Sequence, residues 1–222
     1  MRVWMYFKTF PVGAFQCNCT VIGNPATGKA MIVDPGDDAE VIVRLVKSQG
    51  FDVQYLVHTH AHIDHIGATK QVVQELGGEI CLHKGDYFLY ENMAMQASVL
   101  GLNMDCDVLP VSKSIEDGDV LECDDTLKAQ VLFTPGHTPG SVCFLIDDLG
   151  LHADDGSFLF SGDTLFARSI GRTDLWGGDY DQIISSIRER LLVLPPETLV
   201  IPGHGPNTTI AQELKHNPFF NA

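Results

Sequence analysis

Basic residues are scarce in this sequence. It contains 14 Lys and Arg against 29 Asp and Glu, which gives a formal net charge of -15 at pH 7. Nucleic acids and anionic membrane surfaces bind proteins through basic faces, so neither is expected as a partner. The sequence also has no run of eighteen apolar residues, and it therefore predicts no membrane-spanning helix.

Cysteine pairs of the C-x-x-C type are absent too. The six cysteines are scattered, mostly inside apolar stretches, which is typical of reduced core thiols in a cytosolic protein. Cys17-Asn18-Cys19 is a C-x-C arrangement that could bind a soft metal. This alternative stays open, although no further cysteine lies nearby in the sequence. The first residues, Met1 to Phe7, run into Lys8 without a long apolar segment or a cleavage site, so no secretory signal is expected. The sequence therefore predicts a cytoplasmic location.

Internal repeats, low-complexity tracts and linkers are missing as well. With 222 residues, 45% of them hydrophobic, the chain can bury the core of one domain that spans residues 1–222.

Strands and helices are predicted from the spacing of apolar residues between turn residues. Asp37 or Asp38 is expected to cap a helix that ends at Gln49, before Gly50. In the first half, strands alternate with helices, which implies parallel pairing with the helices outside the sheet. The expected strands are 3–9, 17–23, 29–33, 54–58, 79–83, 108–111, 119–122, 126–134, 141–146, 158–161 and 199–202, and the other expected helices are 66–76, 86–101, 179–194 and 210–215.

One short segment, Thr59-His60-Ala61-His62-Ile63-Asp64-His65, is unusually rich in metal-ligand residue types. Imidazole nitrogens and carboxylate oxygens bind zinc, iron and manganese. His60 and His62 are two residues apart, so in an extended loop they point the same way and can hold one ion. Asp64 and His65 follow at the mouth of a helix, where they can hold a second ion beside the first.

Three later strand ends carry a His or Asp beside a glycine. They are Gly136-His137, Gly162-Asp163 and Gly203-His204. Sites gather where strands end in sheets covered by helices, and glycine lets the backbone approach a ligand closely. Together with the first segment, these residues supply enough ligands for two adjacent ions.

The order of these motifs along nearly the whole chain resembles the metallo-β-lactamase superfamily. The resemblance implies an α/β (α+β) fold, namely a four-layer αβ/βα sandwich of two mixed sheets with helices outside and metals at one rim. It also implies a ligand set for two ions: His60, His62 and His137 for the first, Asp64, His65 and His204 for the second, and Asp163 bridging both.

Within the superfamily, the sequence is similar to the type II glyoxalases, the hydroxyacylglutathione hydrolases. Bridging Asp163 distinguishes it from the class B β-lactamases, which lack that carboxylate. Residues 169–175 and 203–209 resemble the short, single-domain bacterial branch, so the C-terminal glutathione-binding helical domain of larger glyoxalases is not expected. The resemblance implies hydrolysis of a thioester such as S-D-lactoylglutathione to D-lactate and glutathione.

The expected cofactors are two divalent ions, with zinc foremost and iron or manganese as alternatives. Between them a shared water would have a pKa near 7, and the resulting hydroxide would attack the thioester carbonyl. Asp64 would bind metal and orient this hydroxide. Arg172 is the candidate for binding a substrate carboxylate through its guanidinium fork. Asp34, by resemblance to the family's Asp-Pro-Gly, is expected to accept the free N–H of a ligating histidine.

Other classes of protein remain open. A mononuclear-iron persulfide dioxygenase shares the segment Gly171-Arg172-Thr173-Asp174, but the complete second ligand set favours the hydrolase. A lactone hydrolase would need a tyrosine at the site, and Tyr180 is expected at a helix start instead. A structural metal site is disfavoured because such sites usually close four ligands, often with cysteine. The remaining histidines are expected to be structural or exposed: His58, His83, His152 and His216.

Overall fold

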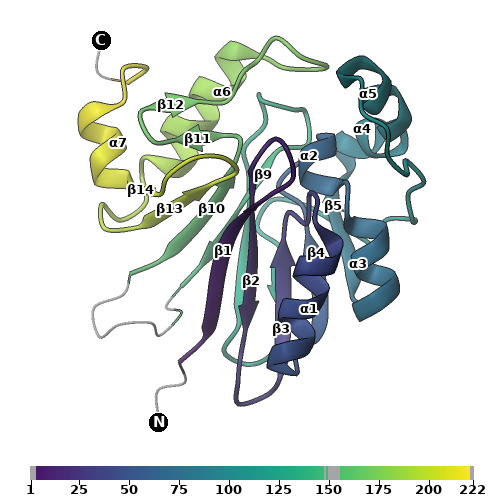
Figure 1. Cartoon of the computed structure of the whole chain (residues 1–222). Coiled ribbons are helices and arrows are strands. Elements are labelled where there is room, and N and C mark those ends of the chain that lie inside the picture. Colours follow the sequence, from purple (N-terminus) through teal and green to yellow (C-terminus); the bar gives the residue numbers. More distant parts are fainter. Residues whose placement is uncertain (1–3, 148, 150–155, 221–222) are drawn as a thin grey trace.

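Two six-stranded sheets form the centre of the structure, a computed structural model that describes residues 4–147, 149 and 156–220 (Figure 1). The strands are β1 (Tyr6–Val12), β2 (Cys17–Gly23), β3 (Lys29–Val33), β4 (Asp52–Val57), β5 (Glu79–His83), β6 (Lys113–Ile115), β7 (Val120–Glu122), β8 (Lys128–Phe133), β9 (Val142–Ile146), β10 (Phe158–Gly162), β11 (Leu165–Phe166), β12 (Ser169–Ile170), β13 (Leu199–Pro202) and β14 (Thr208–Thr209). The helices are α1 (Ala39–Gln49), α2 (Ile63–Ile66), α3 (Thr69–Leu76), α4 (Tyr87–Glu91), α5 (Met93–Leu100), α6 (Tyr180–Ser186) and α7 (Ile210–His216), with a 3-10 turn η1 (Lys84–Asp86) and a π-helical turn η2 (Ile187–Leu191). None of the helices in these ranges is long and apolar enough to cross a membrane.

Both large sheets are mixed. The first has the order β1-β2-β3-β4-β5-β6, antiparallel up to β3 and parallel from there on. The second has the order β14-β13-β10-β9-β8-β7, in which β10 and β13 are parallel and the other pairs are antiparallel. Parallel strands need crossover segments, and α1 and α3 provide them in the first sheet, as the sequence predicted.

Alternating side chains give each sheet two apolar faces. Ile22 packs between the sheets, whereas its neighbour Val21 packs with residues of α1 and α3. In the second sheet, Phe144 packs between the sheets and Cys143 packs with residues of α6 and α7. The chain therefore forms the four-layer αβ/βα sandwich that the sequence predicted.

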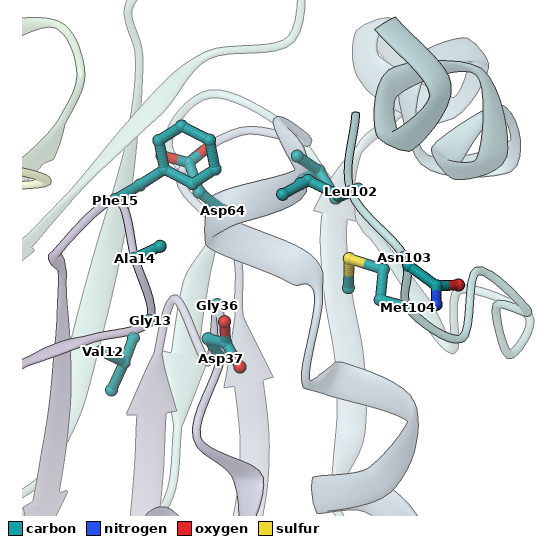
Figure 2. A pocket seen from close by; sticks show the side chains of 11 residues that line it. Val12, Gly13, Ala14, Phe15, Gly36, Asp37, Asp64, Leu102, Asn103 and Met104 are labelled. Carbon is teal, nitrogen blue, oxygen red and sulfur yellow. The ribbon is translucent and has the colours of Figure 1, made fainter. Parts of the chain in front are cut away.

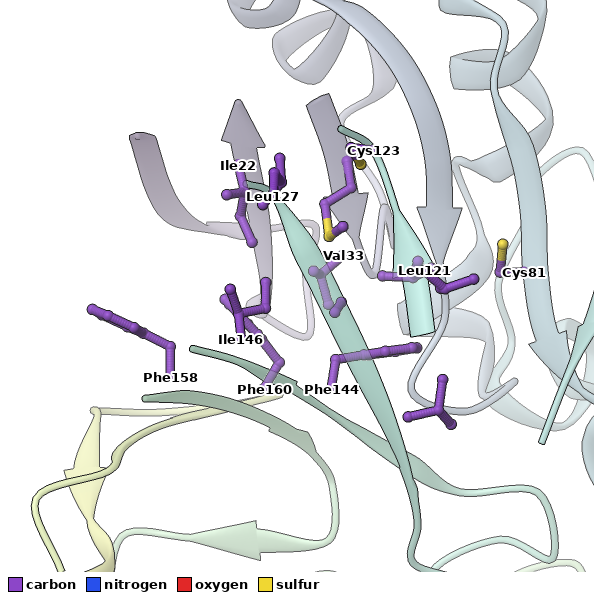
Figure 3. Packing of buried hydrophobic residues seen from close by; sticks show 14 of the residues in the cluster. Ile22, Val33, Cys81, Leu121, Cys123, Leu127, Phe144, Ile146, Phe158 and Phe160 are labelled. Carbon is purple, nitrogen blue, oxygen red and sulfur yellow. The ribbon is translucent and has the colours of Figure 1, made fainter. Parts of the chain in front are cut away.

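The central core lies between the two sheets (Figure 3). Ile22 and Val33 enter it from the first sheet, and Leu121, Phe144 and Phe160 enter it from the second. Full burial of one such side chain contributes about 1.5–3 kcal/mol. All six cysteines are free and five of them are buried, as their apolar surroundings predicted.

Several predicted elements need correction. Asp38 precedes α1 but does not cap it, because its backbone is left-handed (φ 52°) and its Oδ2 accepts from the backbone N–H of Gly13 at 2.8 Å. The helix predicted from Ile66 begins earlier, as α2, and is interrupted before α3. A Cβ on Gly67 would lie 2.6 Å from the carbonyl oxygen of Gly36, so this glycine permits a close approach between segments. Asp64 and His65 consequently lie on a helix.

The apolar segment 108–111 is not a strand. Its side chains pack against α4 and α5, and the carbonyl of Leu109 accepts a hydrogen bond from Tyr90 Oη at 3.0 Å. The first strand is also displaced, because β1 runs from Tyr6 through Pro11 to Val12 along the sheet edge, where proline is tolerated. The predicted helix 86–101 is divided into α4 and α5, and the predicted helix 179–194 is α6 followed by η2.

Candidate metal centre

Three imidazoles meet at the end of β4 and β8. His60 and His62 lie on the loop between β4 and α2, and His137 lies on the loop that follows β8. Nδ1 of His62 is 3.1 Å from Nε2 of His60 and 2.9 Å from Nε2 of His137, and the two Nε2 atoms are 3.2 Å apart. We call these three residues the first cluster. All three are at least nine-tenths buried.

A second cluster lies beside the first and consists of Asp64 and His65 on α2 and His204 after β13. Nε2 of His204 is 3.2 Å from Nε2 of His65 and 3.1 Å from Oδ2 of Asp64. The two sheets join here, because His204 forms an isolated antiparallel bridge with Cys17 at the start of β2. The structure therefore brings each expected set together, and His60, His65 and Asp163 form a third group that spans both sets.

Asp163, directly after β10, lies between the clusters. Its Oδ2 is 3.6 Å from Nε2 of His137, while its Oδ1 is 3.4 Å from Nε2 of His65 and 3.7 Å from Nε2 of His204. One carboxylate oxygen thus faces each cluster. That is the arrangement expected of a bridging carboxylate.

The outward ring nitrogens of His60 and His137 have oxygen partners. Nδ1 of His60 lies 3.1 Å from Thr59 Oγ1, whose own proton goes to Asp34 Oδ2. Nδ1 of His137 lies 2.8 Å from the carbonyl oxygen of Arg172. These acceptors assign the proton of each ring to Nδ1, which leaves an unprotonated Nε2 in the cluster.

The second cluster follows the same pattern. Nδ1 of His65 lies 3.0 Å from Oδ2 of Asp34, and Nδ1 of His204 lies 3.1 Å from the carbonyl oxygen of Phe15. Oxygen partners of this kind orient metal-ligating imidazoles and increase their basicity. The structure therefore places Asp34 against a histidine of the site, as expected for an acceptor.

The donor set fits divalent ions. The unprotonated Nε2 atoms of His60 and His137 cannot hydrogen-bond to each other, yet they lie 3.2 Å apart. Nδ1 of His62 lies 3.1 and 2.9 Å from them. A tetrahedral ion with bonds of about 2.0–2.1 Å holds its ligand atoms roughly 3.3–3.4 Å apart. Oδ1 of Asp163 is buried without a hydrogen-bond partner and faces the second cluster, where a cation would neutralise it.

Protonation equilibria favour donors in the first cluster and at Asp163, whereas in the second cluster burial is outweighed by neighbouring acidic groups, which raise the pKa of His65 and of His204. Burial, and then the neighbouring imidazoles, lower the pKa of His60 well below 6.5. Burial and His137 lower the pKa of His62 to about 3. Burial raises the pKa of Asp163, but the nearby His65, His137 and His204 outweigh it and hold that pKa below its usual range. At neutral pH, His60 and His62 are unprotonated and Asp163 is ionised.

The side chain of Arg172 lies away from the clusters in this structure. Its Nε and Nη2 donate to the two carboxylate oxygens of Asp174 at 2.7 and 2.8 Å, and the side chain is 60% exposed. The carbonyl oxygen, in contrast, contacts His137. Binding of a substrate carboxylate by Arg172 stays a prediction.

The other histidines lie outside both clusters. His58 is fully buried, with Nε2 3.3 Å from Thr69 Oγ1. His83 stacks on Phe133 with ring centroids 4.5 Å apart, and His216 is exposed on α7. His152 lies outside the described residues. The expected structural or surface roles therefore agree with the positions of the three described histidines.

A cavity of about 260 Å³ adjoins the second cluster at Asp64 (Figure 2). The hairpin between β1 and β2 contributes Phe15, and the segment after α5 contributes Leu102 and Met104. Asp37 and Asp64 are the acidic residues of the lining, which contains no Lys or Arg. The cavity therefore suits an uncharged group better than an anionic one.

Sequence reasoning missed the groups that hold the ligand loops. The carbonyl oxygens of Phe15 and Arg172 give no signal in the residue type. Thr59 was visible only through its position next to His60. Asp86 accepts from the backbone of Ala61, and it follows a strand and a glycine, as Asp163 does, so the same signal could have found it.

An αβ/βα sandwich with His and Asp ligands gathered at one rim defines a class of metal-dependent hydrolases. The chain belongs to the metallo-beta-lactamase superfamily, whose sequence model matches residues 12–204. Members of this superfamily bind divalent metals.

Individual relatives match over almost their full length. The chain is 39% identical to the hydroxyacylglutathione hydrolase GloC of Haemophilus influenzae, over 98% of this chain and 99% of that one. Among solved structures, BLEG-1, named a B3 metallo-beta-lactamase, has a TM-score of 0.86 and 37% identity, covering 98% of this chain and 100% of its own. TTHA1623 in a di-iron-bound form has a TM-score of 0.80 and 38% identity, covering 94% of this chain and 98% of its own.

Proposed function

We propose that this protein is a binuclear metal-dependent thioester hydrolase that cleaves S-D-lactoylglutathione or a similar thioester to a hydroxy acid and a thiol. The observation that carries the proposal is the position of Asp163, which directs one carboxylate oxygen at each cluster. A mononuclear site does not need such a bridge. The similarity to the hydroxyacylglutathione hydrolase GloC supports the choice of thioester.

Two divalent ions complete the proposed site. Zinc is the expected species, and the similarity to a di-iron-bound structure supports iron as an alternative alongside manganese. When bound, the ions would polarise the thioester carbonyl and lower the pKa of a shared water towards 7. The ligands would be His60, His62 and His137 for one ion, Asp64, His65 and His204 for the other, and Asp163 for both.

The chain's own groups position the reactants in this proposal. Asp64 belongs to the second cluster and also lines the cavity, so it can orient the attacking water towards a bound substrate. The cavity lining lacks Lys and Arg and suits the neutral acyl group. Arg172 lies on the side of His137, where it can pair with a carboxylate of the thiol moiety once Asp174 is displaced.

The remaining parts of the proposal concern the molecule as a whole. It acts as one domain over residues 1–222 on a small-molecule thioester. Neither nucleic acid nor a membrane is a partner, consistent with the net charge of -15. A cytoplasmic location is supported by six free thiols.

The test is thiol release from S-D-lactoylglutathione by the purified protein, with the ion content measured on the same sample. Rapid release with about two ions per chain is expected. The variant Asp163→Asn tests the bridging role directly. It should reduce thiol release strongly, because the amide cannot offer an anionic oxygen to both clusters.

Other outcomes favour other reactions. One iron per chain, with oxygen uptake on glutathione persulfide and no thiol release, would identify a mononuclear dioxygenase instead. Hydrolysis of a β-lactam without thioester cleavage would indicate the activity for which BLEG-1 is named. Opening of a lactone alone would indicate a lactonase.

A further inference from the structure

The loop that carries His60 and His62 has no secondary structure to satisfy its backbone. Ala61, between the two histidines, is fully buried, so its N–H and carbonyl need partners within the protein. The N–H donates to Oδ2 of Asp86 at 2.9 Å, and the carbonyl accepts from Nε2 of Gln96 at 2.9 Å. Two residues on, the N–H of Ile63 donates to Oε1 of Gln96 at 3.1 Å. The two buried side chains Asp86 and Gln96 thus hold the part of the loop around Ala61.

The same Asp86 carboxylate holds the loop of His137. Thr138 Oγ1 donates to Oδ2 at 2.7 Å, and the N–H of Gly140 donates to Oδ1 at 2.6 Å. Asp86 is completely buried and sits at the end of η1, far from both loops in sequence. One side chain therefore ties together the two segments that supply all three imidazoles of the first cluster.

The fit around this carboxylate is close. A Cβ on Gly140 would lie 2.5 Å from the backbone nitrogen of Asp86 and 2.6 Å from its Oδ1. Only glycine permits the loop to approach this near. Three donors converge on two acceptor oxygens, and an ionised carboxylate has acceptors alone, so it satisfies them all without contributing a proton.

His62 has particular need of this support. His60 and His137 each have an oxygen partner for the outward ring nitrogen. Nε2 of His62 is buried and has none. The direction of its Nδ1 therefore depends on the backbone of its loop, which Asp86 and Gln96 hold.

The second cluster depends on a different carboxylate. Asp34 Oδ2 contacts Nδ1 of His65, and Asp34 also accepts from Thr59 at its backbone N–H and hydroxyl. The hydrogen bonds of the Asp86 carboxylate go to Ala61, Thr138 and Gly140, which belong to the loops of the first cluster. Asp86 thus holds the first cluster, whereas Asp34 contacts the second cluster directly and reaches His60 of the first only through Thr59.

We infer that Asp86 is a positioning residue that sets the affinity of the first ion, held by His60, His62 and His137, without contacting that ion. The inference rests on the proposed binuclear centre and names how one half of it is held. Asp34 contacts a ligand of the second ion directly, at His65, and reaches the first ion's ligand His60 only through Thr59. Loss of Asp86 therefore lowers the affinity for the first ion and leaves the affinity for the second unchanged.

The test uses Asp86→Asn, which keeps the size of the side chain but replaces one acceptor oxygen by an NH2 group. Zinc-loaded protein is titrated with a competing chelator to obtain two dissociation constants per chain. Asp86→Asn should raise one dissociation constant about 10- to 100-fold and leave the other within about twofold of its value in the unsubstituted protein. Thr138→Val removes only one of the three donors to Asp86 and should raise the dissociation constant of the same ion by a smaller factor. This milder variant keeps the inference testable if Asp86→Asn does not fold.

A double-substitution experiment identifies which ion is affected. His62→Ala removes a ligand of the first ion, so adding Asp86→Asn should leave the affinity of the remaining ion within about twofold. Adding Asp34→Asn to His62→Ala should raise the dissociation constant of that remaining ion about 10- to 100-fold.

Equal weakening of both ions, or a lower melting temperature with both affinities unchanged, would overturn the inference. Failure of the proposed function would be visible separately. The unsubstituted protein would then hold fewer than two zinc ions or would leave the thioester intact.

Discussion

The main chain and the side chain of Arg172 make separate contacts. Its carbonyl oxygen accepts the Nδ1 proton of His137, whereas its guanidinium is exposed and paired with Asp174. Substitution of the side chain leaves the carbonyl in place, so the two contacts can be separated by experiment.

Arg172→Ala is expected to raise KM for an anionic thioester roughly two- to fivefold, in line with an exposed ion pair. The value of kcat and the ion content should change little, because the carbonyl still contacts His137. Steady-state kinetics and ion analysis provide the measurement, and Asp174→Asn, which frees the fork, is the matched control. An unchanged KM in Arg172→Ala would exclude the side chain from substrate binding.

At the scale of elements, the strand ends were the predictable part of the site. Apolar strands followed by glycine and a ligand residue predicted His137, Asp163 and His204, and all three lie at one rim. The strand ends are predictable because side chains alternate between the two faces of a sheet, and this alternation is visible in the sequence.

The connections between elements were less predictable. The break at Gly67 depends on its approach to Gly36, and the extended segment at 108–111 is apolar because it packs against Tyr90. The position of Asp38 predicts a helix cap, but its side chain accepts a hydrogen bond from Gly13 instead. Such long-range contacts override local propensity, and nothing in the local pattern signals them.

The segment after α5 forms one wall of the cavity, so its side chains should affect the choice of acyl group. Met104→Trp places a larger, rigid side chain in the lining. We expect kcat/KM for thioesters with bulky acyl groups to fall about tenfold or more relative to the lactoyl thioester, with ion content unchanged. A series of acyl chains measures this, and Val99→Trp, at an exposed position of α5, is the control. An identical acyl preference in Met104→Trp would place the acyl group elsewhere.

At the scale of the whole molecule, the candidate centre joins the two sheets. His60, His62, Asp64 and His65 follow β4 of the first sheet, and His137, Asp163 and His204 follow strands of the second. The bridge between Cys17 and His204 and the hydrogen bond from Asn18 N to Gly203 O, at 2.7 Å, join the sheets at the same rim. Ions bound there would hold both halves of the sandwich.

Removal of the ions should therefore lower the thermal stability. An ion at a free concentration one hundred times its dissociation constant stabilises the folded chain by about 2.7 kcal/mol. For a chain of this size, that corresponds to roughly 5–11 °C in Tm for each ion. Calorimetry of zinc-loaded and chelator-treated protein measures the difference, and His62→Ala should show a smaller one. Equal melting temperatures with and without ions would argue against ligands shared by both sheets.

The spread of the ligands along the chain also sets an order in time. Synthesis proceeds at roughly 5–20 residues per second, so about 7–30 s separate the emergence of His60 from that of His204. Asp64 and His65 therefore lack Asp163 for most of this interval and His204 for all of it. A nascent chain can thus offer only fragments of the centre, and complete loading with two ions has to follow the pairing of β13 with β10.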